Sequence, residues 1–209
     1  MFRLLCWLFL FGLNDPVCFA LEQRPSGQTT TISNFAGEQD LPSAPNGYSW
    51  KSFESIRAWF LVPNGWFVKE ERKGGTQGVF ISKESIEKEG LFKTGFTANV
   101  VLDFLKKNQL PPSQYARQYI AQQLAVPTIL ESWGVGAVGA GSPVSGYGAF
   151  MRVRSPNTGN RIVERMLALG NDRTGKLYLF SFESPESEWA SAVKVGTIMM
   201  DKLVLDPDF

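Results

Sequence analysis

The chain has 209 residues and a formal net charge of +1, and it contains no histidine and only two cysteines. The absence of histidine excludes Ser-His-Asp catalysis, Cys-His catalysis and His-ligated zinc. With 21 basic and 20 acidic residues, the chain has no field of one sign that would attract nucleic acid or an anionic membrane over a long range. We therefore expect no nucleic-acid partner.

The first twenty residues have the order of a secretory signal peptide. Arg3 supplies the positive charge, Leu4–Leu13 is an unbroken apolar run, and Cys18-Phe19-Ala20 places small residues at positions −3 and −1 of a cleavage site. The apolar run is about ten residues long, and a helix that spans a bilayer needs roughly 20. We expect residues 1–20 to be cleaved, which makes the mature protein exported, periplasmic or secreted, and not membrane-spanning.

Three alternatives for this segment stay open. It is an uncleaved anchor, a buried helix, or the site of lipid attachment at Cys18, for which Asp15 is a poor fit three positions before the cysteine.

Cleavage removes both Cys6 and Cys18, so the mature chain has no disulfide, no thiolate nucleophile and no cysteine-ligated zinc.

The rest of the chain divides into a linker and one domain. Residues 21–47 are rich in Gln, Thr, Ser, Pro and Gly and contain few apolar residues, so they cannot bury enough surface to offset their ordering entropy. We expect a flexible polar linker there, followed by a single domain over residues 48–209, which is long enough to bury its own core.

The domain reads as a series of strands with two helices. Proline and glycine turn signals separate the apolar runs, and Pro156-Asn157-Thr158-Gly159 is a hairpin signal. Pro111-Pro112-Ser113 opens one helix, and Ser184-Pro185-Glu186 has the order of a cap, a first-turn proline and a first-turn acid for another, ending near Leu205. Strands are expected within 49–61, 66–70, 78–81, 96–104, 126–133, 149–155, 161–170 and 176–182, and a single helical turn within 83–88. This pattern predicts an α+β fold with an antiparallel sheet covered by helices.

A glycine-rich stretch within residues 134–148 matches a nucleotide-binding pattern by its letters. Gly134-Val135-Gly136-Ala137-Val138-Gly139 reads G-x-G-x-x-G, but the mechanism of that motif needs a helix to open from it. The following segment has no helical periodicity and contains Pro143, so we interpret the stretch as a loop or an irregular strand entry. No cofactor is expected.

The acidic residues of the chain have no metal-ligand spacing, so we also expect no metal site and no catalytic residue.

The predicted hairpin carries the sharpest candidate site. An even-length turn places Arg154 opposite Arg161, Arg152 opposite Val163, and Phe150 opposite Arg165, so four arginines share one face. Like charges directly opposite one another destabilise a sheet, and something must compensate for them. The alternatives are open solvent, acidic neighbours within the chain, or an anionic ligand or protein partner that binds Arg152, Arg154, Arg161 and Arg165.

Four aromatic residues are also candidates for a binding platform: Trp66, Trp133, Tyr147 and Trp189. The position of Trp189 on a helix face favours the core. Trp133 and Tyr147 flank the glycine-rich stretch and are the better surface candidates.

Several short motifs resemble those of one known family. They are Val62-Pro63-Asn64-Gly65-Trp66, Phe80-Ile81-Ser82-Lys83-Glu84, Gly95 to Val101, and Gly175 to Phe180 running into the helix at Ser184. A proline-glycine-tryptophan turn, a central Asn-Val strand and a late Gly-Lys-Leu-Tyr strand resemble the PsbP family, the extrinsic proteins of photosystem II and their broader bacterial relatives. The similarity spans roughly residues 48–209.

The resemblance implies an α-β-α sandwich around an antiparallel sheet and an exported, non-catalytic protein that docks on or helps assemble a larger complex. Photosystem members of the family lie in the thylakoid lumen and influence calcium and chloride retention. This chain has no histidine to match their metal-associated histidines and no chloroplast transit region, which favours a bacterial periplasmic relative.

Three functions follow, in order of preference. The first is an exported, non-catalytic accessory or interaction protein with a protein partner, which docks on or assists a membrane-associated complex. The second is a luminal photosystem-II-type extrinsic subunit. The third is a carboxylate-dependent hydrolase, which requires two acids that converge in a cleft with separated pKa values.

Overall fold

The computed structural model describes residues 33–34, 41–86, 92–155 and 159–209. The predicted signal peptide, residues 1–20, lies outside the described residues, and so do residues 87 and 88 of the predicted helical turn. Within the described ranges, no helix combines the length and the apolar character needed to cross a membrane.

The described chain forms eleven strands and three α-helices, with two short 3₁₀ turns at Glu54–Ile56 and Glu186–Glu188. The strands are β1 (Ser33–Asn34), β2 (Tyr48–Phe53), β3 (Ala58–Pro63), β4 (Phe67–Lys73), β5 (Thr76–Ser82), β6 (Gly95–Val101), β7 (Ile129–Val138), β8 (Val144–Arg154), β9 (Arg161–Asn171), β10 (Lys176–Pro185) and β11 (Val204–Leu205). The helices are α1 (Phe104–Asn108), α2 (Pro112–Leu124) and α3 (Trp189–Asp201).

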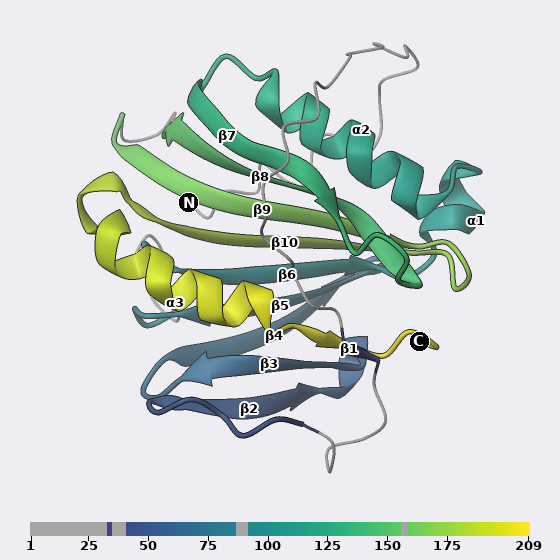
Figure 1. Cartoon of the computed structure of the whole chain (residues 1–209), viewed down its shortest axis with the longest axis horizontal. Coiled ribbons are helices and arrows are strands. Elements are labelled where there is room, and N and C mark those ends of the chain that lie inside the picture. Colours follow the sequence, from purple (N-terminus) through teal and green to yellow (C-terminus); the bar gives the residue numbers. More distant parts are fainter. Residues whose placement is uncertain (1–32, 35–40, 87–91, 156–158) are drawn as a thin grey trace.

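The strands form one large and one small sheet (Figure 1). The large sheet has seven strands in the order β4-β5-β6-β10-β9-β8-β7, and every neighbouring pair in it is antiparallel. The small sheet has the order β1-β11-β3-β2, with β1 and β11 parallel. The predicted antiparallel α+β class is therefore confirmed.

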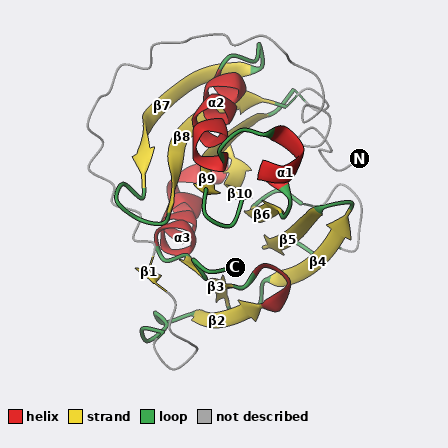
Figure 2. Ribbon diagram, turned by 90° about the vertical axis from the view of Figure 1, so that its right-hand side faces the viewer, coloured by secondary structure: helices red, strands yellow, loops and turns green. Residues whose placement is uncertain are grey.

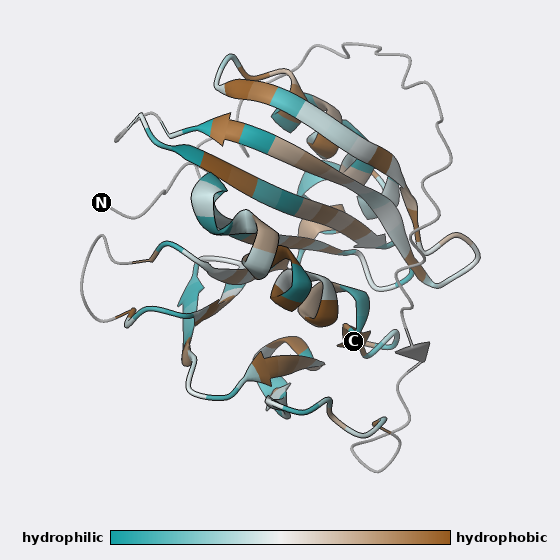
Figure 3. Ribbon diagram, turned by 60° about the vertical axis from the view of Figure 1, so that its left-hand side comes forward, coloured by the Kyte–Doolittle hydropathy of each residue, from teal (hydrophilic) through white to brown (hydrophobic). Residues whose placement is uncertain are grey.

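Both faces of the large sheet are apolar, and each has its own core. Along β10, Tyr178 and Phe180 belong to the core that includes α3, whereas Leu177 and Leu179 belong to the core that includes α1 and α2. Side chains alternate between the two faces of a strand, so this period-two division places α2 and α3 over opposite faces. Figure 3 shows hydrophobic stretches within the strands of the large sheet.

The small sheet completes the α3 side of the molecule. Phe60 from β3 contacts Phe96 and Phe180 of the large sheet edge to face, at ring-centroid distances of 5.2 and 6.1 Å. Phe53 from β2 packs on Phe60 at 5.1 Å. Figure 2 shows β2 and β3 beside α3 and the β4–β5 end of the large sheet. The α3 face is therefore covered by a helix and a second sheet, and the α2 face by helices.

Part of the predicted linker contacts the domain. Ser33 and Asn34 pair with Val204 and Leu205, and the indole Nε1 of Trp50 donates a hydrogen bond to the carbonyl oxygen of Pro42 at 2.7 Å. The boundary at residue 48 stays a prediction. The residues of both cores lie within residues 48–209, so a chain that begins at Leu21 retains both cores.

Two predicted boundaries of the last helix are wrong. Ser184 does not cap a helix: it pairs with Val163 in the sheet and is fully buried, and its hydroxyl donates to the carbonyl oxygen of Pro185. The α-helix begins at Trp189 and ends at Asp201, because the following chain leaves to pair as β11 with β3. Strand pairing outweighs the local capping signal here.

Most of the glycine-rich stretch lies in two strands, which are joined by a turn at residues 139–143. β7 runs through Gly134 and Gly136 to Val138, and β8 already begins at Val144. The register of β7 shifts between Trp133 and Gly136, where Gly134 has φ 60°, so the strand contains a bulge that favours glycine. No helix opens from the G-x-G-x-x-G letters, which removes the structural context of nucleotide binding.

A buried tyrosine makes the stability sensitive to alkaline pH. The hydroxyl of Tyr178 is buried without a hydrogen-bond partner among the described residues, and burial, with a smaller contribution from the charge of Asp206, raises its pKa above the ordinary value of 10.0. Above about pH 10 the unfolded chain loses this proton while the folded chain keeps it, so the free energy of unfolding falls as pH rises.

The Tyr178→Phe variant is expected to show a shallower fall in the free energy of unfolding between about pH 9 and pH 11, measured by urea unfolding at each pH. Some slope remains because burial also raises the pKa of Tyr115. Equal slopes for the variant and the wild type would contradict this account of Tyr178.

Candidate docking face on the β8–β9 hairpin

The hairpin has the register that its sequence predicts. Arg154 lies opposite Arg161, Arg152 opposite Val163, and Phe150 opposite Arg165. On the other side of β8, the strand β7 places Glu131 opposite Arg152 and Trp133 opposite Phe150. We call this side of β7, β8 and β9 the hairpin face, with the residues Glu131, Trp133, Phe150, Arg152, Arg154, Arg161 and Arg165.

Acidic side chains from three elements compensate for most of the arginine charge. Arg152 forms ion pairs with Glu131 of β7 and, through Nε at 2.7 Å, with Oε1 of Glu186. The Nε contact is outside hydrogen-bond geometry, so it is electrostatic. Arg161 Nη1 lies 3.6 Å from the second oxygen of Glu186. The alternative of acidic neighbours within the chain therefore applies to these arginines.

Arg165 has a structural position. Its side chain is 5% exposed, its Nη2 lies 2.6 Å from Oδ1 of Asp201 at the end of α3, and its guanidinium lies 5.4 Å from the ring centre of Phe150. The buried cation is thus held between α3 and the sheet, out of reach of a large partner. Of the four predicted site residues, Arg165 is the one that the fold encloses.

Arg154 is the opposite case. It is exposed at the end of β8, faces Arg161 across the hairpin, and forms no ion pair with any residue in the described ranges. Among the described residues, the ion-pair partners of these four arginines are three acids, Glu131, Glu186 and Asp201. The excess positive charge is therefore located at the hairpin end, on Arg154 beside Arg161.

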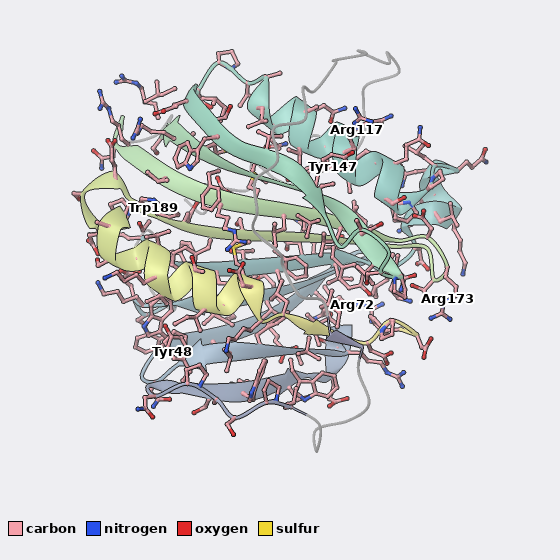
Figure 4. All side chains as sticks on the ribbon, viewed as in Figure 1. Tyr48, Arg72, Arg117, Tyr147, Arg173 and Trp189 are labelled. Carbon is pink, nitrogen blue, oxygen red and sulfur yellow. The ribbon has the colours of Figure 1, made fainter. Side chains whose placement is uncertain are left out.

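The aromatic candidates do not form one platform. Trp133 is 36% exposed and stacks on Phe150 at 5.7 Å with an interplanar angle of 10°. Tyr147 is on the α2 face, with the guanidinium of Arg117 at 5.6 Å from its ring centre (Figure 4). Trp189 packs edge to face against Phe150 and, like Trp66, is partly buried against the α3-side core. Trp133 alone extends the hairpin face as an exposed aromatic surface.

Sequence reasoning missed the contribution of β7 to this face. The sequence predicts a strand within residues 126–133, but no local signal indicates that it pairs with β8 and brings Glu131 and Trp133 beside the hairpin arginines. In the described part of the chain, no group of three Asp, Glu, His or Cys side chains is placed to hold a metal ion.

Comparisons with known proteins give fold-level similarities of low degree. No family model and no curated protein sequence matches the chain. Cyanobacterial PsbP (CyanoP) from Synechocystis sp. PCC 6803 aligns with 12% identity and a TM-score of 0.43, over 79% of this chain and 95% of its own. The Ran-binding protein Mog1p of Saccharomyces cerevisiae aligns with 13% identity and a TM-score of 0.46, over 77% and 97%.

LpqN, involved in cell envelope biogenesis of Mycobacterium tuberculosis, aligns with 8% identity and a TM-score of 0.37, over 80% of this chain and 83% of its own. Likenesses of this degree assign no family and no function to the chain. The resemblance to the PsbP family stays a prediction from the sequence motifs.

Proposed function

We propose that this chain is an exported, non-catalytic accessory protein of PsbP-like sandwich fold, which docks on a protein of a membrane-associated complex through the hairpin face. The observation that carries the proposal is the exposed pair of Arg154 and Arg161, placed directly opposite each other with one arginine in excess of the acids. Facing cations are destabilising in a sheet unless something compensates for them.

A protein partner with an acidic surface fits this arrangement. Guanidinium groups form bidentate hydrogen bonds with carboxylates, and arginine and tryptophan are enriched among the residues that dominate binding energies. Trp133 offers an exposed ring on the same face. The near-neutral net charge of the chain favours recognition by this local patch over attraction by the whole surface.

The two other functions have less support. A luminal photosystem-type subunit would need the same docking chemistry in a different compartment. A carboxylate-dependent hydrolase needs two acids with separated pKa values. The two acids that lie beside Arg152, Glu131 and Glu186, are instead its ion-pair partners.

A pull-down with a charge-reversed variant tests the proposal. Residues 21–209 would be used as bait on the envelope fraction of the source organism, with the Arg154→Glu variant and a matched Arg72→Glu control, because Arg72 is an exposed arginine on β4 at the other end of the sheet. We expect wild type and control to recover the same partner, and Arg154→Glu to recover about tenfold less.

Equal recovery by all three proteins would contradict docking at the hairpin face while leaving an interaction function intact. Recovery of no protein by any of them would contradict the interaction function itself. Urea unfolding of both variants shows beforehand that they fold like the wild type.

A further inference from the structure

The large sheet ends in two outer strands, β4 and β7, at opposite ends of the strand order (Figure 1). Within the described ranges, no strand pairs with the outer side of β4 or of β7. Each outer strand therefore presents backbone N–H and C=O groups along one side, which is a template for pairing with another strand.

The β4 edge is protected by charge. Five of its seven residues are charged and exposed, in the unbroken run Lys69-Glu70-Glu71-Arg72-Lys73. Pairing another strand there would desolvate these side chains, and charges of this kind are the usual means by which proteins keep an edge strand single.

The β7 edge lacks this protection. Its ten residues contain one charge, Glu131, and that carboxylate is already neutralised by Arg152 of the neighbouring strand. Leu130 is 44% and Trp133 36% exposed, which places two of the four most exposed large hydrophobic residues of the described chain on this strand. β7 thus presents a neutral, apolar edge.

Bulges limit how far a second strand can follow β7. The register with β8 shifts between Ile129 and Glu131 and again between Trp133 and Gly136, so the regular stretches are Glu131–Trp133 and Gly136–Val138. A bulge bends and twists its strand. Pairing at this edge is therefore short, and it is expected to be reversible.

We propose that β7 pairs antiparallel with β7 of a second copy of this chain, forming a closed two-fold dimer in which the two large sheets become continuous. The contrast between the edges favours pairing of β7 with β7 over pairing of β7 with β4. A β7-to-β4 contact would be heterologous and would propagate without end, and the charges of β4 oppose it. A β7-to-β7 contact is isologous and closes after two copies.

Charge does not oppose the self-pairing. The net charge of the chain is +1, so two copies repel each other only weakly. In an antiparallel two-fold pair, Glu131 faces its own copy only if the axis passes through residue 131. In every other register it faces an uncharged residue of β7. Trp133 belongs to both surfaces, but the dimer needs the backbone edge of β7 and docking needs the arginine side chains, so either can fail without the other.

Analytical ultracentrifugation of residues 21–209 tests the dimer over a range from about 5 µM to about 500 µM, where weak association is measurable. We expect the average mass to rise towards twice that of the monomer. The Leu130→Lys/Trp133→Lys variant is expected to stay monomeric, and the matched Phe67→Lys control, a 47% exposed residue of β4, to associate like the wild type.

Hydrogen exchange of the wild type gives a second readout that needs no variant. The amides of β7 are expected to gain protection between the lowest and the highest concentration, while those of β4 do not change. Three results would each overturn the proposal: a wild type that stays monomeric, a β7 variant that still associates, or equal protection of β4 and β7. A monomeric wild type would leave the β7 edge available to a strand of another protein.

Discussion

The Arg165→Ala variant is expected to lose about 3 kcal/mol of its free energy of unfolding, because it breaks a buried ion pair and leaves one charge without its partner. Arg165 is the most enclosed charged side chain of the hairpin face, with Nη2 at 2.6 Å from Asp201 Oδ1 and a guanidinium over the ring of Phe150. Alanine removes both contacts, including the ion pair that links the end of α3 to the sheet.

Urea unfolding of the variant and the wild type measures this loss. The matched control is Arg154→Ala, which removes an exposed arginine of the same face that has no ion pair with described residues, and it is expected to change the free energy of unfolding by less than about 0.5 kcal/mol. The Asp201→Ala and Arg165→Ala effects should also be less than additive. A loss below about 1 kcal/mol for Arg165→Ala would contradict a structural role of the pair.

The Gly170→Ala variant is expected to lose about 3 kcal/mol as well, at the upper end of what overpacking costs. A Cβ atom on Gly170 would lie 2.0 Å from the backbone nitrogen of Ser113 and 2.2 Å from the carbonyl carbon of Pro112. These are backbone atoms of the first turn of α2, which cannot rotate away as a side chain does. The helix would have to lift from β9 and disturb the core beneath it.

Thermal and urea unfolding compare this variant with Gly75→Ala. At Gly75 the added Cβ would meet only the terminal atoms of the Lys107 side chain, which can move aside. We expect the control to unfold within about 1 kcal/mol of the wild type. If the two variants had the same stability, the close approach of α2 to Gly170 would not be a feature of the folded protein.

The parts of the structure that depend on neighbouring residues in the chain could be predicted from the sequence. The β8–β9 register is of this kind, because a turn signal and a period of two are sufficient to place Arg154 opposite Arg161. The start of α2 was predicted for the same reason, since Pro112 stands at its first position.

The parts of the structure that depend on distant residues could not be predicted from the sequence. The first turn of α2 is held by Asp172, whose carboxylate accepts hydrogen bonds from the backbone nitrogen and the hydroxyl of Ser113 at 2.8 and 2.6 Å across 59 positions of sequence. Similarly, no local signal connects Glu186 or Asp201 with the arginines of the hairpin. Whether those arginines face solvent, acids or a ligand depends on where α3 packs, which the sequence pattern does not specify.

The most direct test of the central claim is photocrosslinking in cells of the source organism, with a photoreactive phenylalanine analogue in place of Trp133 and, as the matched control, in place of Phe67. Both residues are exposed aromatics on outer strands of the same sheet, at opposite ends. Docking through the hairpin face predicts an adduct with a different protein at position 133 and none at position 67. No such adduct at 133, or the same adduct at both positions, would contradict it.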